Sequence, residues 1–182
     1  MVYILLGEGF EEIEALGPLD LLRRAEIEVS TVSLTGELPV KGGHGIIVHA
    51  DITLEQTDFE KMEMLVLPGG GGGVASIEKN PAAIDMIRRS WEAGKMLAAI
   101  CAAPSLLAGL NILEGTKIVC HPSVAGEITA AGGNLQPELS VVRDRNLITG
   151  KAAGASIDFG LEIIAALRNR EDAEQIRRAI FY

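Results

Sequence analysis

The chain has 182 residues, of which 48% are hydrophobic and 23% charged, a mixture typical of one globular domain. It carries 16 lysine and arginine residues against 25 aspartate and glutamate residues, which gives a formal net charge of −9 at pH 7. The composition excludes a disordered chain, a coiled coil and a collagen-like fibre. The acidic balance disfavours nucleic acid and anionic membranes as partners.

The cysteine content and the first residues predict a cytoplasmic protein. Two cysteines, Cys101 and Cys120, are too few for a secreted disulfide framework and suit a reducing compartment. The segment 1–7 has no basic residue and is followed by Glu8, which is unlike a secretory signal. An uncharged stretch over 96–113 is interrupted by proline, glycine and asparagine, so we interpret it as a buried strand, a turn and a buried helix rather than a membrane span.

Short apolar runs rich in β-branched residues alternate with helical patterns along the chain. Val2–Leu6 is almost continuously apolar, which is typical of a parallel strand covered on both faces. Pro18 lies within a helical pattern, where we expect it to kink or restart the helix, and Asn80 before Pro81 is a favourable helix cap. The predicted strands are Val2–Leu6, Val29–Leu34, Ile46–His49, Met64–Leu67, Leu97–Ile100, Lys117–Cys120, Ser140–Arg143 and Leu147–Thr149. The predicted helices are Glu11–Arg24, Pro81–Trp91, Pro104–Leu110, Val124–Ala131, Ser156–Leu167 and Ala173–Ile180.

The order of these elements predicts an α/β fold. Strands that alternate with helices imply a mostly parallel sheet with helices on both faces. Active sites in such folds lie beyond the carboxyl ends of the strands. We therefore look for chemistry among the residues that directly follow a strand.

Cys101 is the first candidate, because it follows a predicted strand and precedes a helix that opens near Pro104. A residue on such a turn projects its side chain at the edge of the sheet, as in a nucleophile elbow. The following helix offers N–H groups and a positive dipole end, which both favour a thiolate. The alternative is that Cys101 is a small buried hydrophobic residue.

The glycine run Gly69–Gly73 follows another predicted strand. Glycines let the backbone approach a ligand and expose N–H groups that stabilise an anion, so the Gly70 amide is a candidate oxyanion donor. A plain flexible turn is the alternative, since no Lys-Ser/Thr pair follows to make a phosphate loop. The Gly7-Glu8-Gly9 segment lacks the third glycine of a dinucleotide-binding fingerprint, and we expect no cofactor.

Three glutamates lie at the start of the first predicted helix. Acidic residues there complement the helix dipole, which is the role we expect for Glu11 and Glu12. Glu14 lies on another face of the helix, from which it could point over the carboxyl edge of the sheet and be kept protonated by burial. A protonated carboxyl beside a thiolate donates a hydrogen bond and can then move a proton.

The histidines leave more than one interpretation open. His121 stands at a predicted strand end before Pro122, where it could transfer protons or cap a loop. His44 and His49 are five residues apart, so strand alternation does not bring them to one face and we expect no metal site. Cys120 lies within an apolar run and is predicted to pack in the core.

Three segments together resemble the ThiJ/PfpI superfamily, in particular its deglycase subgroup, which includes the Parkinson-disease protein and bacterial relatives. They are Gly9-Phe10-Glu11-Glu12-Ile13-Glu14, Leu67-Pro68-Gly69-Gly70 and Ala99-Ile100-Cys101-Ala102-Ala103-Pro104. The resemblance runs almost end to end and implies a single domain over residues 1–182. It further implies a flavodoxin-like three-layer sandwich of the class I glutamine amidotransferase type, and a homodimer.

The resemblance also implies roles for particular residues. Cys101 would be the nucleophile on a strained elbow, and Glu14 the protonated acid that hydrogen-bonds its sulfur. The N–H groups of Gly70 and Ala102 would be oxyanion donors, and His121 matches a histidine often placed with them.

The chain departs from the family pattern at several positions. Ala102 stands where the protease branch has a histidine, which argues against a protease. His44 stands where the closest subgroup has an arginine near the partner's site, and His49 replaces a cysteine at the dimer interface. Ala103 replaces a frequent glycine after the elbow. These changes leave the binding of anionic substrates open.

Two functions fit these residues. The first is a glutathione-independent glyoxalase, a hydro-lyase of the glyoxalase III type, or a deglycase, acting on methylglyoxal-like dicarbonyls or early glycation adducts through Cys101. The second is a redox-sensing stress-response protein or chaperone in which Cys101 is oxidised. A folded relative without activity is the remaining alternative. We expect a small carbonyl compound as substrate, and no nucleic acid or membrane partner.

Overall fold

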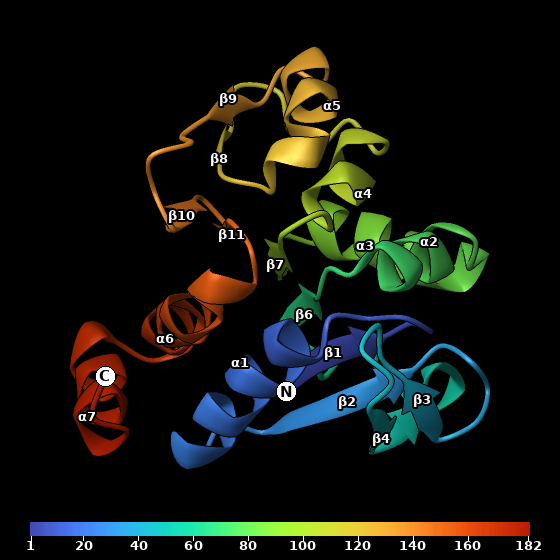
Figure 1. Cartoon of the computed structure of the whole chain (residues 1–182), viewed down its shortest axis with the longest axis vertical. Coiled ribbons are helices and arrows are strands. Elements are labelled where there is room, and N and C mark those ends of the chain that lie inside the picture. The colour runs from blue at the N-terminus through green and yellow to red at the C-terminus, as the bar shows by residue number, and fades with distance from the viewer.

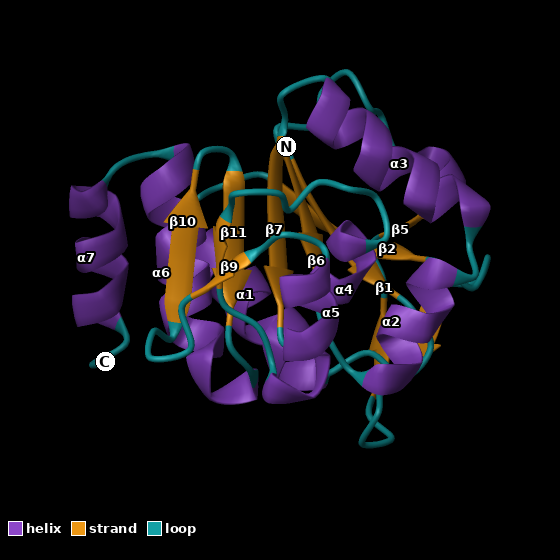
Figure 2. Ribbon diagram, turned by 90° about the horizontal axis from the view of Figure 1, so that it is seen from above, coloured by secondary structure: helices purple, strands orange, loops and turns teal.

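A computed structural model describes residues 1–182, and its centre is a sheet of seven strands. The strands of this sheet are β1 (Val2–Leu6), β2 (Val29–Ser33), β5 (Ile52–Thr53), β6 (Met64–Leu67), β7 (Met96–Ile100), β10 (Val141–Asp144) and β11 (Leu147–Gly150). Their order is β10-β11-β7-β6-β1-β2-β5, and all neighbours run parallel except the antiparallel pair β10 and β11. Figure 2 shows these strands side by side. The mostly parallel sheet predicted from the sequence is confirmed.

Helices cover both faces of the sheet, which makes the flavodoxin-like three-layer sandwich that we expected (Figure 1). One face carries α1 (Glu12–Arg24) and α6 (Ser156–Leu167), and α7 (Arg170–Ala179) packs on α6. The other face carries α2 (Gly71–Glu78), α3 (Pro81–Glu92), α4 (Pro104–Ala108) and α5 (Ala125–Ala130). None of these helices combines the length and the apolar character needed to cross a membrane.

Strand β1 shows why a continuously apolar run forms the middle of the sheet. Its side chains alternate between two cores, with Val2, Ile4 and Leu6 packed on the side of α1 and α6. Tyr3 and Leu5 pack on the side of α3 and α4. Both sets are buried because successive side chains of a strand point to opposite faces.

Two small sheets lie outside the main one. β3 (Pro39–Lys41) pairs antiparallel with β4 (Ile47–His49), and β8 (Lys117–Ile118) pairs with β9 (Asn134–Leu135). The predicted strand over 117–120 is therefore too long. It ends early because the Val119 N–H donates to the Thr149 side-chain hydroxyl at 3.0 Å instead of joining a ladder.

The structure contradicts a restart of the first helix at Pro18 and the flexible-turn alternative for the glycine run. Helix α1 runs through Pro18 without a break, and Pro18 is buried where a side chain at Gly160 of α6 would meet it at 3.1 Å. The segment Gly71–Gly73 is the first turn of α2 and not a flexible turn. Glycine is a poor helix former, but a side chain at Gly73 would lie 2.6 Å from the Phe10 backbone, so close packing explains why glycine is present in this helix.

Candidate active site

Cys101 occupies the turn between β7 and α4, where the sequence predicted a strained elbow. Its φ of +65° lies in the left-handed region, which is unfavourable for a residue with a side chain. Two backbone hydrogen bonds hold this conformation: the Cys101 N–H donates to the Gly150 carbonyl at 2.9 Å, and its carbonyl accepts from the His121 N–H at 2.8 Å. The thiol is free and half-buried. The elbow therefore presents a fixed, reachable sulfur at the carboxyl edge of the sheet.

Glu14 reaches the same place from α1. Its side chain is fully buried, and Oε2 accepts a hydrogen bond from the Gly69 N–H at 2.8 Å. Its other oxygen, Oε1, is buried without a hydrogen-bond partner. A methyl group at Gly69 would lie 2.6 Å from Glu14 Oε2 and 2.7 Å from Cys101 Cβ, so both side chains lie against this glycine. The sequence predicted that Glu14 points over the sheet edge, and it does.

Burial shifts both groups toward their protonated forms, and the charge of Glu14 adds to the shift of Cys101. Burial raises the pKa of Glu14 to about 7, although the Gly69 amide and the Cys101 thiol act in the opposite direction. Burial, the charge of Glu14 and hydrogen bonding to Glu14 raise the pKa of Cys101 to about 12. The two titrations are coupled, because the thiol hydrogen bond stabilises the ionised carboxylate and the ionised carboxylate in turn makes the thiol harder to ionise.

The expected preference for a free thiolate is therefore wrong in this environment. Helix α4 spans only Pro104–Ala108, so its dipole is small. The N–H groups of Ala102 and Gly70 do lower the pKa of Cys101, but burial and Glu14 outweigh them. Between pH values of about 7 and 12 the pair as a whole holds one proton, which either the sulfur or the carboxyl can carry.

Gly70 supplies an amide at the sulfur because no other residue fits there. Its φ is +84°, and a methyl group on it would lie 2.6 Å from both the Glu11 amide nitrogen and the Gly9 carbonyl oxygen. Backbone hydrogen bonds from Gly70 and Ala102 lower the pKa of Cys101, so both amides lie beside the sulfur. The arrangement can stabilise negative charge next to a nucleophilic sulfur.

His121 begins a 3₁₀ turn over Pro122–Val124, as the loop-capping alternative suggested. Its Nδ1 accepts from the Ser123 N–H at 3.2 Å and lies 2.8 Å from the Ser123 hydroxyl. Together with the backbone bond to Cys101, this makes His121 a support of the elbow. Its neighbour Cys120 is buried in the core, where it was predicted to pack.

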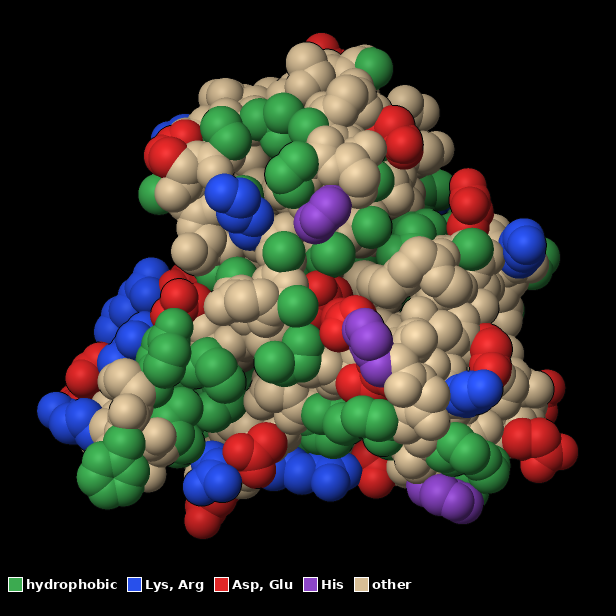
Figure 3. All heavy atoms as spheres, in the orientation of Figure 1, with side chains coloured by type: hydrophobic (Ala, Val, Ile, Leu, Met, Phe, Trp, Pro, Cys, Tyr) green, Lys and Arg blue, Asp and Glu red, His purple; other side chains and the backbone are tan.

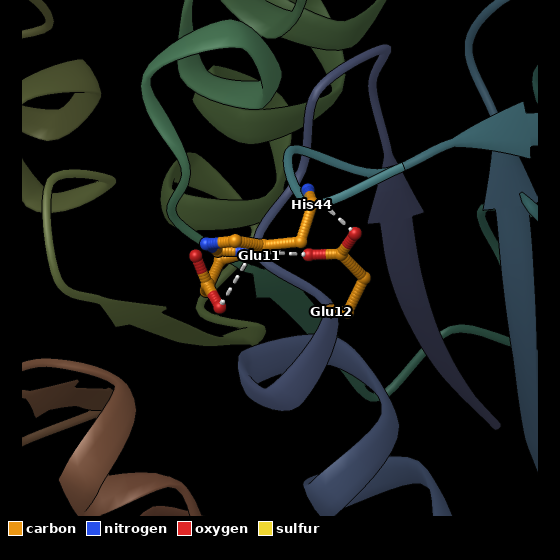
Figure 4. A group of neighbouring side chains, drawn as sticks. All are labelled: Glu11, Glu12 and His44. Carbon is orange, nitrogen blue, oxygen red and sulfur yellow. Dashed lines mark hydrogen bonds and ion pairs between the residues drawn. The ribbon is translucent and has the colours of Figure 1, made fainter. Parts of the chain in front are cut away.

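Glu12 does more than complement the helix dipole, the only role that its place in the sequence indicates. Its side chain is buried, at 5% exposure, and Oε1 accepts from the His44 N–H at 2.8 Å and the Ile46 N–H at 3.4 Å. Oε2 lies 2.9 Å from His44 Nδ1 (Figure 4). Burial opposes ionisation, but these hydrogen bonds lower the pKa of Glu12. Glu12 thus anchors the loop between β3 and β4, a contact across 32 residues that local patterning does not reveal.

Glu11, Glu12 and His44 bring one potential metal-ligand atom each to within 4.8 Å of one another. A divalent cation could bridge such a group. Both oxygens of Glu12 already accept hydrogen bonds from the loop, which accounts for the arrangement as an anchor. His49 belongs to the end of β4 and is not part of the group.

Known proteins resemble this chain over almost its whole length. Residues 1–166 match the DJ-1/PfpI family. The chain is 31% identical to protein dj-1beta of Drosophila melanogaster over 177 residues, covering 97% of this chain and 94% of that protein. It is 27% identical to the glutathione-independent glyoxalase DJR-1.2 of Caenorhabditis elegans, covering 97% and 93%. The solved structure of oxidized Toxoplasma gondii DJ-1 superimposes with a TM-score of 0.93 at 30% identity, covering 100% and 97%.

Proposed function

This chain belongs to the DJ-1/PfpI family, and on that premise we propose that it is a cysteine-dependent, glutathione-independent glyoxalase or deglycase. Its substrates would be methylglyoxal-like dicarbonyls or early glycation adducts. The observation that carries the proposal is the contact of Cys101 and Glu14 with the same glycine, with the Gly70 and Ala102 amides beside the sulfur. The relative from Caenorhabditis elegans that is named a glutathione-independent glyoxalase supports the reaction class.

The first step is attack of Cys101 on the aldehyde carbon of methylglyoxal. The Glu14 carboxylate accepts the thiol proton as the C–S bond forms, and the carbonyl oxygen becomes an alkoxide. The N–H groups of Gly70 and Ala102 stabilise this alkoxide, and Glu14 returns the proton to it. The product of the step is a hemithioacetal. Cys101 does not need to be ionised before the attack, because Glu14 takes its proton during it.

The second step moves a proton between neighbouring carbons. The Glu14 carboxylate removes the hydrogen from the carbon bonded to sulfur, and the hemithioacetal hydroxyl proton passes to the former ketone oxygen, which gives an enediolate with its charge on the oxygen of the sulfur-bound carbon. The carboxyl then protonates the adjacent carbon, the former ketone carbon. The sulfur-bound carbon is left as a thioester of lactate. The aldehyde carbon has been oxidised by two electrons and the ketone carbon reduced by two, so no external oxidant is needed.

The third step releases the product. Water attacks the thioester carbonyl, again opposite the Gly70 and Ala102 amides, and the Cys101 sulfur leaves and regains a proton. The sum is methylglyoxal plus water to lactate. His121 does not transfer a proton in this scheme; it holds the elbow through its backbone and its cap on the Ser123 amide.

Lactate formation from methylglyoxal in thiol-free buffer tests the proposal. We expect lactate from the wild type and from Cys120→Ala, the matched loss of the other cysteine, whereas Cys101→Ala should lose at least about 1,000-fold in rate. Equal lactate from the wild type and Cys101→Ala would remove Cys101 from the mechanism. No lactate from any variant would reject the glyoxalase assignment.

The position of the free Cys101 thiol beside Glu14 supports a second candidate, a redox-sensing stress-response protein. The thiol is half-buried and lies near a carboxyl that can hydrogen-bond an oxidised sulfur, which would stabilise sulfenic and then sulfinic acid once formed, while the raised pKa of Cys101 slows the first oxidation. One similar structure is of an oxidized relative. Mass spectrometry after mild peroxide should then show oxidation of Cys101 before the buried Cys120; an unmodified Cys101 would end this candidate.

The homodimer and the cytoplasmic location also remain proposals. Three exposed isoleucines lie around Glu12, whose carboxylate accepts from the Ile46 N–H: Ile13, Ile46 and Ile47. A second copy of the chain would cover these apolar side chains. Both cysteines are free, which suits a reducing compartment.

A further inference from the structure

The charges that act on the Cys101 site are negative. The Glu11 N–H donates to the Gly69 carbonyl at 3.0 Å, and the Glu11 charge contributes to raising the pKa of Glu14. No lysine or arginine contributes to the pKa shift of either Glu14 or Cys101. On the face drawn in Figure 3, acidic side chains adjoin one histidine near the middle, and no lysine or arginine side chain touches that group.

His44 is the group that can offset this charge. Its Nδ1 lies 2.9 Å from Glu12 Oε2 and 3.6 Å from Glu11 Oε1, so the imidazole stands between two carboxylates (Figure 4). The hydrogen bond to Glu12 and the charges of Glu11 and Glu12 raise the pKa of His44. Lys41, on the same hairpin, forms no ion pair with Glu11 or Glu12. Glu14 and Cys101 lie against Gly69, whose carbonyl accepts from the Glu11 N–H.

Histidine at this position makes the local charge depend on pH. An arginine would stay charged at every working pH and offset Glu11 permanently. A histidine loses its charge within reach of neutrality. Once His44 is neutral, the charge of Glu11 and the one negative charge shared by Cys101 and Glu14 face an incoming substrate without a cation beside them.

We propose that Glu11 and His44 make Cys101 selective for uncharged and cationic carbonyl compounds over anionic ones, and that protonation of His44 relaxes this selectivity. As a statement about substrates, the inference rests on the proposed function. The charge preference itself is a property of the surroundings of Cys101, so it can be measured without turnover.

Two alkylating reagents of nearly the same shape measure this preference. Iodoacetamide is neutral and iodoacetate is an anion; with each, the Cys101 sulfur forms a C–S bond to the CH₂ carbon and iodide leaves. Both rates are followed by mass spectrometry of the Cys101 peptide. Each is proportional to the fraction of Cys101 in its reactive form, so this fraction cancels in the ratio of the two rates. Dividing it by the same ratio for a free small thiol at the same pH removes intrinsic differences between the reagents. EDTA is present throughout, so that no metal at His44 contributes.

At a pH above the pKa of His44, the ratio of the iodoacetamide rate to the iodoacetate rate should be about threefold to tenfold larger for Cys101 of the wild type than for the free thiol. This is the effect expected of one or two unscreened charges several ångströms away. The preference should shrink as the pH falls. Glu11→Gln should lower it at high pH, and His44→Arg should keep it low and independent of pH. Glu92→Gln, which removes an equal charge from the exposed end of α3, should behave as wild type.

Equal ratios in the wild type, Glu11→Gln and Glu92→Gln would overturn the inference. So would a pH dependence that persists in His44→Arg, because the titrating group would then be another one. Neither outcome depends on lactate formation. A protein that shows the charge preference but makes no lactate would reject the glyoxalase proposal alone, and one that makes lactate without the preference would reject only this inference.

Discussion

Cys101 and Glu14 act as one titrating unit because both lie against Gly69, where Glu14 is fully buried and Cys101 half-buried. The sequence identified both residues, since each stands where a strand or helix meets the carboxyl edge of the sheet. It did not reveal the direction of the Cys101 shift, which depends on burial and on the shortness of α4. Glu12 escaped prediction for a similar reason, because its partner His44 is distant in the chain.

The shared proton predicts the pH profile of the reaction. Burial raises the pKa of Glu14 to about 7, so below that pH both groups hold protons and no base is available. The rate of lactate formation should rise through about pH 7 as the first proton leaves, and remain high on the alkaline side until the second one leaves. Initial rates across this range check the profile; a rate that stays flat through neutrality would show that Glu14 is not the titrating base.

The same shift predicts how Glu14 affects stability. The unfolded carboxyl has a pKa of 4.5 and the folded one about 7, so the unfolded state binds fewer protons between these values and stability falls as pH rises through them. Above about pH 7 the loss is about 3 kcal/mol. Glu14→Gln should therefore raise the free energy of unfolding by about 1–3 kcal/mol near pH 8 and change it little near pH 4.

Urea unfolding at both pH values measures this difference, with Glu92→Gln as the control for loss of one exposed carboxylate. The amide introduced by Glu14→Gln keeps an oxygen that can accept the Gly69 N–H, so an effect of equal size at both pH values would mean that packing, and not ionisation, explains it.

Among the elements, strands were easier to predict than the segments between them. Alternation between two cores makes β1 and β6 apolar throughout, and that pattern is local. Helix α2 was missed because its glycine-rich first turn is stabilised by close packing on Phe10 and not by helix propensity. The helix cap at Asn80 was predicted correctly, and its side chain accepts from the Ala82 and Ala83 amides at 3.1 Å.

Neighbouring glycines at the start of α2 should respond differently to a methyl group. Gly70 has a φ of +84° and backbone atoms 2.6 Å from the added carbon, whereas Gly71 has nothing within 4 Å. Gly70→Ala should cost at least about 2 kcal/mol of stability and most of the lactate activity, because the loop must move away from Cys101. Gly71→Ala should be neutral or stabilise by up to about 1 kcal/mol.

Thermal unfolding and lactate rates of the two variants, measured side by side, decide the point. Equal tolerance of both substitutions would show that the Gly70 amide is not held where the structure places it.

For the whole molecule, parallel strands bring the ends of β6, β7 and β11 to one edge, where the site forms. The order of elements was enough to predict this layout, because right-handed crossovers leave few alternatives. It was not enough to predict surfaces. The exposed isoleucines around Glu12 became visible only once α1 and the hairpin of β3 and β4 were seen together.

The exposed isoleucines Ile13, Ile46 and Ile47 lead us to expect a homodimer in solution. We expect light scattering to give about twice the chain mass of 19.3 kDa, because burying exposed apolar side chains favours association. Ile47→Glu should shift the protein toward the monomer, whereas Leu139→Glu, which changes an exposed apolar residue before β10, should not. A wild-type monomer at micromolar concentration would contradict the expected homodimer.

The most direct test of the central claim is a double-mutant cycle on lactate formation from methylglyoxal, with Cys101→Ala, Glu14→Gln and both together. If thiol and carboxyl share one proton and act as a unit, each single substitution should lower kcat/KM by at least about 100-fold to 1,000-fold, and the double substitution should lose little more than the worse single one. Near-wild-type turnover in Glu14→Gln, or losses that multiply in the double variant, would contradict the account.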